Sequence, residues 1–274
     1  TYAYVIRAGG SPNFAVIDVG ISTSPSLVGS LTLSGTPQNI FVSGNYAYVA
    51  SESNTQELQV INVATPSSPT LVGTFDAPGG ANALGVYASG NTAYVVRTSS
   101  ANAEFFVINV STPSSPSLIG SLEMGVTEHE VVVSGNFAYL ASGSNTQELQ
   151  VVSIATPSSP SLVGSLNLAG TADATTIALG GSTVFMGQST TFSVIDVTTP
   201  TFPTLLGSLS LPAAINDVAS NPGNADTYVF LATSDTANEF KVIDAATPTL
   251  PAVLGQRNIA GSNPLLGAAY SATL

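Results

Sequence analysis

The sequence predicts an all-β fold, a six-bladed β-propeller made of four-stranded antiparallel blades. Three observations support this prediction. One segment, written VINVATPSSPTLVGT in its second copy, recurs six times with a period of 43 to 48 residues. Each repeat unit contains four short stretches in which apolar and polar residues alternate, and no stretch has helical periodicity. Four strands in a repeat of this length are typical of a propeller blade.

The recurring segment keeps a fixed register from copy to copy. In every copy a proline falls seven residues after an Asp, Asn or Ser, and a glycine follows four residues after that proline. The glycines that hold this register are Gly29, Gly73, Gly120, Gly164, Gly207 and Gly255. Six equivalent segments therefore predict six equivalent blades.

The second unit shows the four expected strands most clearly, at residues 39–43, 46–51, 58–63 and 71–76. The first two are joined by Gly44-Asn45, a pair that accepts positive φ angles and so favours a tight hairpin. The last two are joined by TPSSP, whose prolines fix φ and lack an N–H donor. We expect this corner to end both strands in every unit.

The two ends of the chain carry parts of one further unit. The chain opens with TYAYVIR, which matches a second strand, and residues 265–274 match the first-strand segment LGVYASG. We therefore expect a C-terminal strand to join three N-terminal strands, which would leave no open edge between the first and last blades. Residues 1–274 are then a single propeller domain, and we expect it to be part of a longer exported protein.

The third strands resemble a known repeat. FAVIDV, FSVIDV and FKVIDA, together with SGNYAYVAS and TPSSPTLVGS, are similar to the LVIVD repeat of bacterial and archaeal surface propellers. The resemblance covers essentially the whole chain, and LQVVSI, with Ser153 at the usual Asp position, departs from it most. It implies a propeller fold and export from the cell. That family has no single known activity, so the resemblance implies no reaction.

Composition limits the partners. The chain has 274 residues, a net charge of −12 and four Lys or Arg residues. Such a surface repels phosphate backbones and anionic lipids, which argues against nucleic-acid partners, and no apolar run reaches the ~20 residues of a membrane-spanning helix. Without cysteine there is no disulfide framework and no thiol nucleophile. A surface rich in Ser and Thr and poor in Lys suits an extracellular or cell-surface location.

Variable loops on one face of a propeller are where we expect binding. The polar residues that lead into the first strands, at the mouth of the central channel, are Gln38, Asn39, His129, Glu130, Asn216 and Asp217. Oxygen-rich clusters suit calcium, and the candidate metal ligands are Glu128, Glu130, Asp173 and Asp217. No DxDxDG loop is present, and a hydrated polar funnel is the simpler alternative.

His129 is the one histidine of the sequence, and it lies between two glutamates. Their carboxylates would raise its pKa and let it act as a general acid or base, so hydrolase or lyase activity is one hypothesis. A single histidine cannot build a zinc site of several histidines. No GxSxG motif marks a nucleophile, and a solvated loop histidine is the simpler interpretation.

Three further sets of repeated residues have structural interpretations. Glutamates expected to be solvated, one with Arg97 as a weak surface partner, precede the third strand: Glu57, Glu104, Glu148 and Glu239. Side chains expected to accept hydrogen bonds from corner N–H groups are Asp18, Asn62, Asn109, Asp196 and Asp244. Tyrosines expected to pack between blades are Tyr48, Tyr94 and Tyr139.

These observations favour a non-enzymatic extracellular module that provides a rigid scaffold for protein interaction, adhesion or self-assembly. Outer strands such as 27–33 and 162–168 have no lysine to discourage pairing into an oligomer or filament. The alternative is a propeller that binds calcium or a small polar ligand such as a glycan at the channel mouth. No other cofactor is expected.

Overall fold

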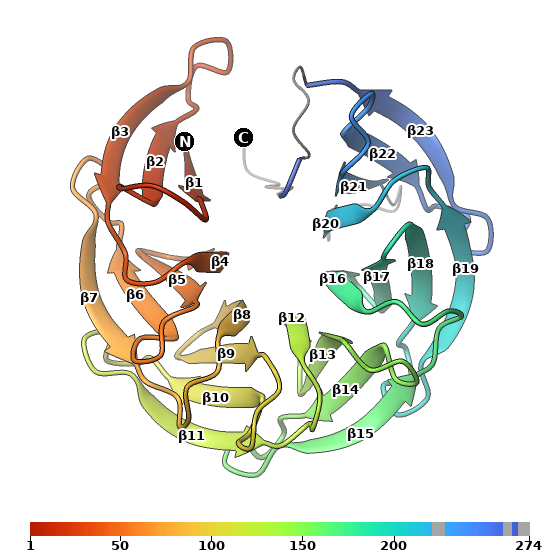
Figure 1. Cartoon of the computed structure of the whole chain (residues 1–274), viewed down its shortest axis with the longest axis horizontal. Coiled ribbons are helices and arrows are strands. Elements are labelled where there is room, and N and C mark those ends of the chain that lie inside the picture. The colour runs from red at the N-terminus through yellow and green to blue at the C-terminus, as the bar shows by residue number, and fades with distance from the viewer. Residues whose placement is uncertain (221–227, 260–264, 268–274) are drawn as a thin grey trace. The chain divides into compact units, whose positions relative to one another are not determined.

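The computed structural model of the chain describes residues 1–220, 228–259 and 265–267. The chain is a six-bladed β-propeller in which each blade is an antiparallel sheet, so the predicted fold class is confirmed (Figure 1). All regular secondary structure of the described residues is β-strand. Among these residues there is no helix of the length and hydropathy that crossing a membrane requires.

Blades 1 to 3 follow one another along the chain. Blade 1 consists of β1 (Tyr2–Ile6), β2 (Phe14–Asp18) and β3 (Ser26–Leu31). Blade 2 consists of β4 (Pro37–Ser43), β5 (Tyr46–Ser51), β6 (Leu58–Asn62) and β7 (Thr70–Phe75). Blade 3 consists of β8 (Ala83–Ser89), β9 (Thr92–Arg97), β10 (Phe105–Asn109) and β11 (Ser117–Leu122). The four strands predicted in the second unit therefore agree with β4 to β7 to within a residue or two.

Blades 4 to 6 repeat the same order. Blade 4 consists of β12 (Glu128–Ser134), β13 (Phe137–Ser142), β14 (Leu149–Ser153) and β15 (Ser161–Leu166). Blade 5 consists of β16 (Ala174–Gly180), β17 (Thr183–Gln188), β18 (Thr191–Asp196) and β19 (Thr204–Ser210). Blade 6 consists of β20 (Ile215–Ser220), β21 (Tyr228–Thr233), β22 (Phe240–Asp244) and β23 (Ala252–Arg257).

Contact density divides the chain into two compact units. The first comprises Thr1–Val131 with Ala155–Pro160, and the second comprises Val132–Ile154 with Ser161–Leu274. The corner of blade 4 belongs to the first unit because it packs on Gly120 of blade 3. The expectation of one domain over residues 1–274 stays a prediction.

Blade 1 has three strands in the described residues, in the order β1-β2-β3. The sequence predicts that a strand from residues 265–274 completes this sheet. Most of that segment falls outside the described residues, so closure by the C-terminal strand stays a prediction.

Apolar clusters form where the faces of neighbouring blades meet. In the first unit, Tyr48 and Val60 of blade 2 pack with Val86 and Val95 of blade 3 in one buried cluster. Strands in the middle of a blade are covered on both faces, which explains why β5 and β6 are almost continuously apolar. Tyr48 is 4% exposed, which confirms that this repeated tyrosine packs between blades.

In five of the six blades, the corner between the third and fourth strands is held within its own blade by an Asp or Asn side-chain acceptor. Asn62 Oδ1 accepts the N–H of Ala64 at 2.9 Å. The residues that accept in the same way, each from the N–H two positions later, are Asp18, Asn109, Asp196 and Asp244. The predicted capping of the corners is therefore confirmed. At Asp196, hydrogen bonds from the hydroxyl and N–H of Thr198 lower the pKa of the carboxyl group.

The outer side of the corner packs on the preceding blade in blades 2 to 6. A Cβ atom on Gly73 of β7 would clash with the carbonyl oxygen of Pro113, in the corner of blade 3. The other glycines at which a Cβ atom would clash in the same way with a carbonyl oxygen of the next corner are Gly29, Gly120, Gly164 and Gly207. We call this the corner–glycine contact. Only glycine leaves room for the neighbouring backbone, which explains why glycine and corner recur together.

The glutamates before the third strands are buried, so the expectation that they are solvated is wrong. Each is at most 2% exposed. The carboxylates accept the N–H of the residue twenty positions later, just beyond the fourth strand; the pairs are Glu57 with Ala77, Glu104 with Met124, Glu148 with Leu168 and Glu239 with Ile259, at 2.8 to 3.1 Å. A buried N–H without an acceptor costs free energy, and the carboxylate removes that cost. Burial raises the pKa of Glu57.

Blades 1 and 5 supply the same acceptor by other means. In blade 1, Asn13 Oδ1 accepts the N–H of Leu33 at 2.7 Å. In blade 5 the carbonyl oxygen of Thr190 accepts the N–H of Leu211 at 2.8 Å. What the fold requires at this position is an acceptor, and a charge is not needed.

Arg97 is fully buried, so the predicted surface pair with Glu104 is also wrong. Its Nε donates to the carbonyl oxygen of Ala103 at 2.7 Å, and its guanidinium carbon lies 4.7 Å from the ring centroid of Phe106. Loss of water around the guanidinium lowers the pKa of Arg97, and the nearby charges of Glu104 and Glu57 oppose that change. Arg97 therefore ties the loop 98–104 to the interior of its blade.

Candidate functional site

The loops that lead into the first strands end in β-bulges. In β4 the register against β5 shifts between Pro37 and Asn39, so Gln38 is the additional residue. The additional residues of the other bulges are Leu84, Thr175 and Asn216. The predicted pairs Gln38-Asn39 and Asn216-Asp217 are therefore bulge pairs, in which the first residue leaves the ladder and the second returns to it. Bulges redirect side chains and are frequent beside binding sites.

In the first unit, Asn39 and Glu130 are brought together although 91 positions separate them. Asn39 Nδ2 donates to Glu130 Oε1 at 3.1 Å, and Asn39 Oδ1 accepts the N–H of Val86 at 3.4 Å. Gly85 permits this arrangement, because a Cβ atom there would lie 2.8 Å from the Cα of Glu130. The first strands of blades 2, 3 and 4 are thus linked by Asn39, while Gln38 is exposed.

His129 lies in β12 and is half-buried, so it is not the solvated loop residue of the simpler interpretation. Its carbonyl oxygen faces Gly85, at 2.9 Å from the position of a Cβ atom there. Glu128, on its N-terminal side, is fully buried. Acid–base chemistry through His129 stays a prediction.

In the second unit, Asp217 is bonded to Thr176 of the preceding blade. Thr176 Oγ1 donates to Asp217 Oδ1 at 3.0 Å, and both oxygens accept the N–H of Val218, at 3.1 and 2.8 Å. The Cβ position of Gly267 lies 3.6 Å from Asp217 Oδ2. Asp217 therefore joins the first strands of blades 5 and 6, as Asn39 joins those of blades 2 and 3.

Asn216, the additional residue of the bulge in β20, is held by two partners. Its Nδ2 donates to the carbonyl oxygen of Leu265 at 2.7 Å. Its amide also exchanges hydrogen bonds with the hydroxyl of Ser234, at 3.0 and 3.1 Å. The orientation of this amide is therefore fixed by the protein.

A hollow of about 650 Å³ opens beside Asn216 in the second unit, and we call it the blade-5 hollow. Asp173, Thr175 and Ser189 also line it. Its volume falls in the range of small-molecule sites, roughly 300–1,000 Å³. Of the residues predicted to bind a ligand or ion, Asp173 and Asn216 share this hollow, whereas Asp217 is not among its lining residues.

The candidate metal ligands do not form one cluster in the part of the chain that the structure describes. Glu128 and Glu130 belong to the first unit, whereas Asp173 and Asp217 belong to the second. Among the described residues no group of three or more His, Asp or Glu side chains is placed to hold a metal ion. Calcium takes six to eight oxygen ligands. Calcium binding therefore stays a prediction that no such cluster supports.

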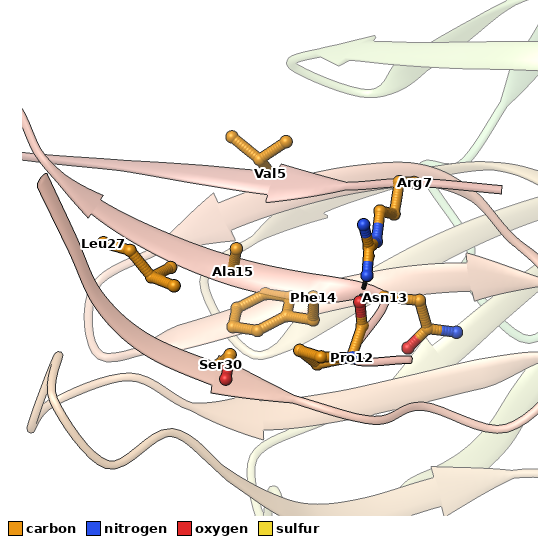
Figure 2. Close-up of a pocket in the computed structure, with 8 residues that line it drawn as sticks. All are labelled: Val5, Arg7, Pro12, Asn13, Phe14, Ala15, Leu27 and Ser30. Carbon is orange, nitrogen blue, oxygen red and sulfur yellow. Dashed lines mark hydrogen bonds between the residues drawn. The ribbon is translucent and has the colours of Figure 1, made fainter. Parts of the chain in front are cut away.

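A smaller hollow of about 260 Å³ lies on one face of blade 1 (Figure 2). Val5 and Phe14 border it, and Arg7 Nε donates to the carbonyl oxygen of Pro12 at 2.8 Å at one end. Val5 is 46% exposed, whereas its counterpart Val49 in β5 is fully buried between blades. This hollow is therefore a sheet face of the kind that packs on another blade, and its shape gives no sign of a ligand site.

Three corners carry large exposed apolar side chains that the sequence reasoning missed. One is Ile21 in blade 1, which is 69% exposed, and the other two precede the last proline of the corners of blades 5 and 6. The residue before the second proline is serine in the corners of blades 1 to 4, but Phe202 in blade 5 and Leu250 in blade 6. Both are 76% exposed. The N–H of Phe202 donates to Thr199 at 2.8 Å and that of Ser68 donates to Thr65 at 2.9 Å, so the turn is the same with either side chain. The contrast between SSP and TFP or TLP was the available signal.

The comparisons with known proteins agree with this geometry. A model of the LVIVD repeat matches residues 34–77, 80–123 and 128–168, which correspond to blades 2, 3 and 4. The chain carries LVIVD repeats. The match covers three repeats, whereas the resemblance seen in the sequence covers essentially the whole chain. No curated protein matches the sequence.

Several solved structures share the fold. A functionally unknown protein from Desulfotomaculum acetoxidans DSM 771 superimposes with a TM-score of 0.74 at 13% identity, over 98% of this chain and 84% of that one. The computationally designed Ika8 protein gives 0.63 at 14% identity, over 94% and 76%. A chain of the Mitotic Checkpoint Complex gives 0.72 at 12% identity, over 94% and 78%. At these identities the likeness concerns the fold alone.

Proposed function

We propose that this LVIVD-repeat propeller is a non-enzymatic extracellular or cell-surface module, a rigid scaffold for protein association. The observation that carries the proposal is the pair Phe202 and Leu250, each 76% exposed at a position where the turn needs only serine. Because both side chains are exposed, they contribute little to the stability of the fold. Large exposed apolar side chains are frequent in surfaces that a protein partner covers, and aromatic anchors contribute strongly to such interfaces.

The outer strands that follow these corners also expose apolar side chains. Leu205 of β19 is 46% exposed and Leu254 of β23 is 59% exposed. Both strands are the last in the hydrogen-bonding order of their blades, and in Figure 1 each is the outermost strand of its blade. A partner that meets a corner and the strand after it would cover exposed apolar side chains of both. This supports protein association, adhesion or self-assembly over nucleic-acid or lipid binding.

The repeated polar groups support a scaffold rather than an enzyme. The glutamates before the third strands and the acceptors at the corners are bonded to backbone N–H groups. Their chemistry is used to hold loops in place. A location outside the cell is supported by a composition rich in Ser and Thr and poor in Lys, by the 7% content of charged residues and by the surface proteins that the repeat resembles.

The double variant Phe202→Ser/Leu250→Ser tests this proposal, because it introduces the residue of the other four corners. We expect the wild type to self-associate, or to capture a protein from an envelope extract, and the variant to lose most of that binding. Light scattering over a concentration series and affinity capture measure the two forms of association.

Leu118→Ser is the matched control, since Leu118 is 45% exposed on β11 of another blade. It should associate like the wild type. A wild type that stays monomeric and captures no protein would refute the proposal, as would a double variant that associates as strongly as the wild type.

A further inference from the structure

The blade-5 hollow exists because one loop is short. In blade 5 the second and third strands are joined by Ser189 and Thr190 alone, with Gln188 paired directly to Thr191. The corresponding loops of blades 2, 3, 4 and 6 span residues 52–57, 98–104, 143–148 and 234–239. Blade 5 therefore lacks the residues that form this part of the surface in the other blades.

The longer loops close over the loop that precedes their own first strand. In blade 2 the N–H of Glu52 donates to the carbonyl oxygen of Thr36 at 2.9 Å. In blade 6 the N–H of Ser234 donates to the carbonyl oxygen of Ala214 at 2.9 Å. With only two residues, the blade-5 hairpin instead reaches the next blade, where the carbonyl oxygen of Ser189 accepts the N–H of Ile215 at 2.8 Å. The missing loop leaves the hollow open.

The two-residue hairpin of blade 5 contains a strained backbone conformation. Ser189 has a φ of 50° and is the one non-glycine residue with a positive φ among the described residues. Such a conformation is uncommon for serine, and strained backbone of this kind is found at functional sites. A glycine would fit this turn with less strain. The serine does not help the turn, and it places a hydroxyl at the wall of the hollow.

The walls combine oriented polar groups with a small aliphatic surface. The amide of Asn216 is fixed by Leu265 and Ser234 before any ligand arrives. Thr175 and Asp173 are exposed at the same hollow, and Leu266 is 70% exposed beside them. Preorganised polar groups lose less entropy when they bind, which is a feature of built ligand sites.

The charge of the walls selects the class of ligand. Asp173 contributes a carboxylate, and no Lys, Arg or His is among the described residues that line the hollow. Phosphate, sulfate and carboxylate ligands are therefore disfavoured. Hydroxyl and amide groups can donate to and accept from sugar hydroxyls, and a carboxylate accepts from them, while aliphatic side chains cover the C–H face of a sugar ring.

We propose that the blade-5 hollow binds an uncharged carbohydrate unit, with Asp173, Thr175 and Asn216 bonded to its hydroxyls and Leu266 against its ring. The site goes beyond the association function proposed above and lies on the loops into the first strands, whereas Phe202 lies in a corner between a third and a fourth strand. Loss of one activity therefore leaves the other measurable.

Saturation-transfer difference NMR tests the site with glucose, galactose, mannose and N-acetylglucosamine as separate probes. We expect at least one of these sugars to give a saturable signal with the wild-type chain. Thr175→Phe fills the hollow from an exposed bulge position and should weaken binding by tenfold or more. Asp173→Ala should weaken it severalfold through the loss of an acceptor.

Gln38→Phe is the matched control, because Gln38 occupies the same bulge position in blade 2, where the longer loop is present. It should bind the sugar like the wild type, and thermal melting verifies that all variants fold. The proposal is wrong if none of the four sugars gives a signal. It is also wrong if Thr175→Phe and Gln38→Phe bind equally, or if glucuronate binds as tightly as glucose.

Discussion

The corners between third and fourth strands and the loops between second and third strands differ in how many constraints they obey. Five of the six corners are held on their inner side by an Asx acceptor, and the corners of blades 2 to 6 pack on their outer side against the glycine of the preceding blade. A loop between second and third strands is held chiefly where it supplies an acceptor to the residue beyond the fourth strand. The corners are accordingly almost identical in sequence, and the loops differ in length and residue type.

This difference indicates where the propeller can acquire function. Several side chains of a corner stay exposed under these constraints, and at one of these positions Phe202 and Leu250 replace the serine of the other corners. The loops tolerate a change as large as the two-residue hairpin at Ser189, provided that an acceptor remains. A rigid part and a variable part are thus built from the same repeat.

The largest effect is expected where a corner touches glycine. Gly73→Ala places a Cβ atom 2.1 Å from the carbonyl oxygen of Pro113, and we expect the free energy of unfolding to fall by about 3 kcal/mol. Gly255→Ala is the matched control, because no atom of the described residues, apart from its chain neighbours, lies within 4 Å of its Cβ position. It should leave stability unchanged or raise it by about 0.5 kcal/mol. Urea unfolding measures both, and equal losses would contradict the corner–glycine contact.

A smaller effect is expected from removing the single acceptor of a loop. Glu148→Ala leaves the N–H of Leu168 buried without its 2.8 Å bond and should cost about 2 kcal/mol. Glu148→Gln keeps an acceptor of similar size and should stay within about 0.5 kcal/mol of the wild type. Chemical denaturation of the two variants separates the need for an acceptor from the need for a charge. A glutamine variant as unstable as the alanine variant would show that the charge itself matters.

The smallest effect is expected from the ion pair in the corresponding loop of blade 6. Lys241 Nζ donates to Asp235 Oδ2 at 2.7 Å, and this hydrogen bond lowers the pKa of Asp235. A lowered folded-state pKa stabilises the protein above the unfolded value, about 3.9, and this stability is lost as the pH falls through the folded-state value.

Urea midpoints from pH 6 to pH 2 should therefore decrease more steeply for the wild type than for Asp235→Asn. Asp196 and Glu57 also titrate with shifted pKa values, lowered and raised respectively, but they are present in both proteins and cancel in the difference. Parallel curves for the two proteins would mean that the pair contributes nothing to the acid limb.

Several features follow from the sequence because they depend on neighbouring residues. The strand boundaries in the second unit follow from apolar alternation, from Gly44, which has a φ of 57°, and from the prolines of the corner. The Asx acceptors follow from the two-residue spacing between Asn62 and Ala64. Counting the repeats predicts six blades, since each unit forms one sheet.

The candidate site could be located in the sequence only as a set of loops. The sequence alone determined the repeat, the number of blades and the face that varies, because these depend on local pattern and periodicity. The tertiary structure decided that Glu148 is buried, that a glycine meets the corner of the next blade, and that Asp173 and Asn216 share a hollow while Asp217 does not. The physical reason is that these contacts join residues of different strands or different repeat units, and the pattern within one unit carries no information about them.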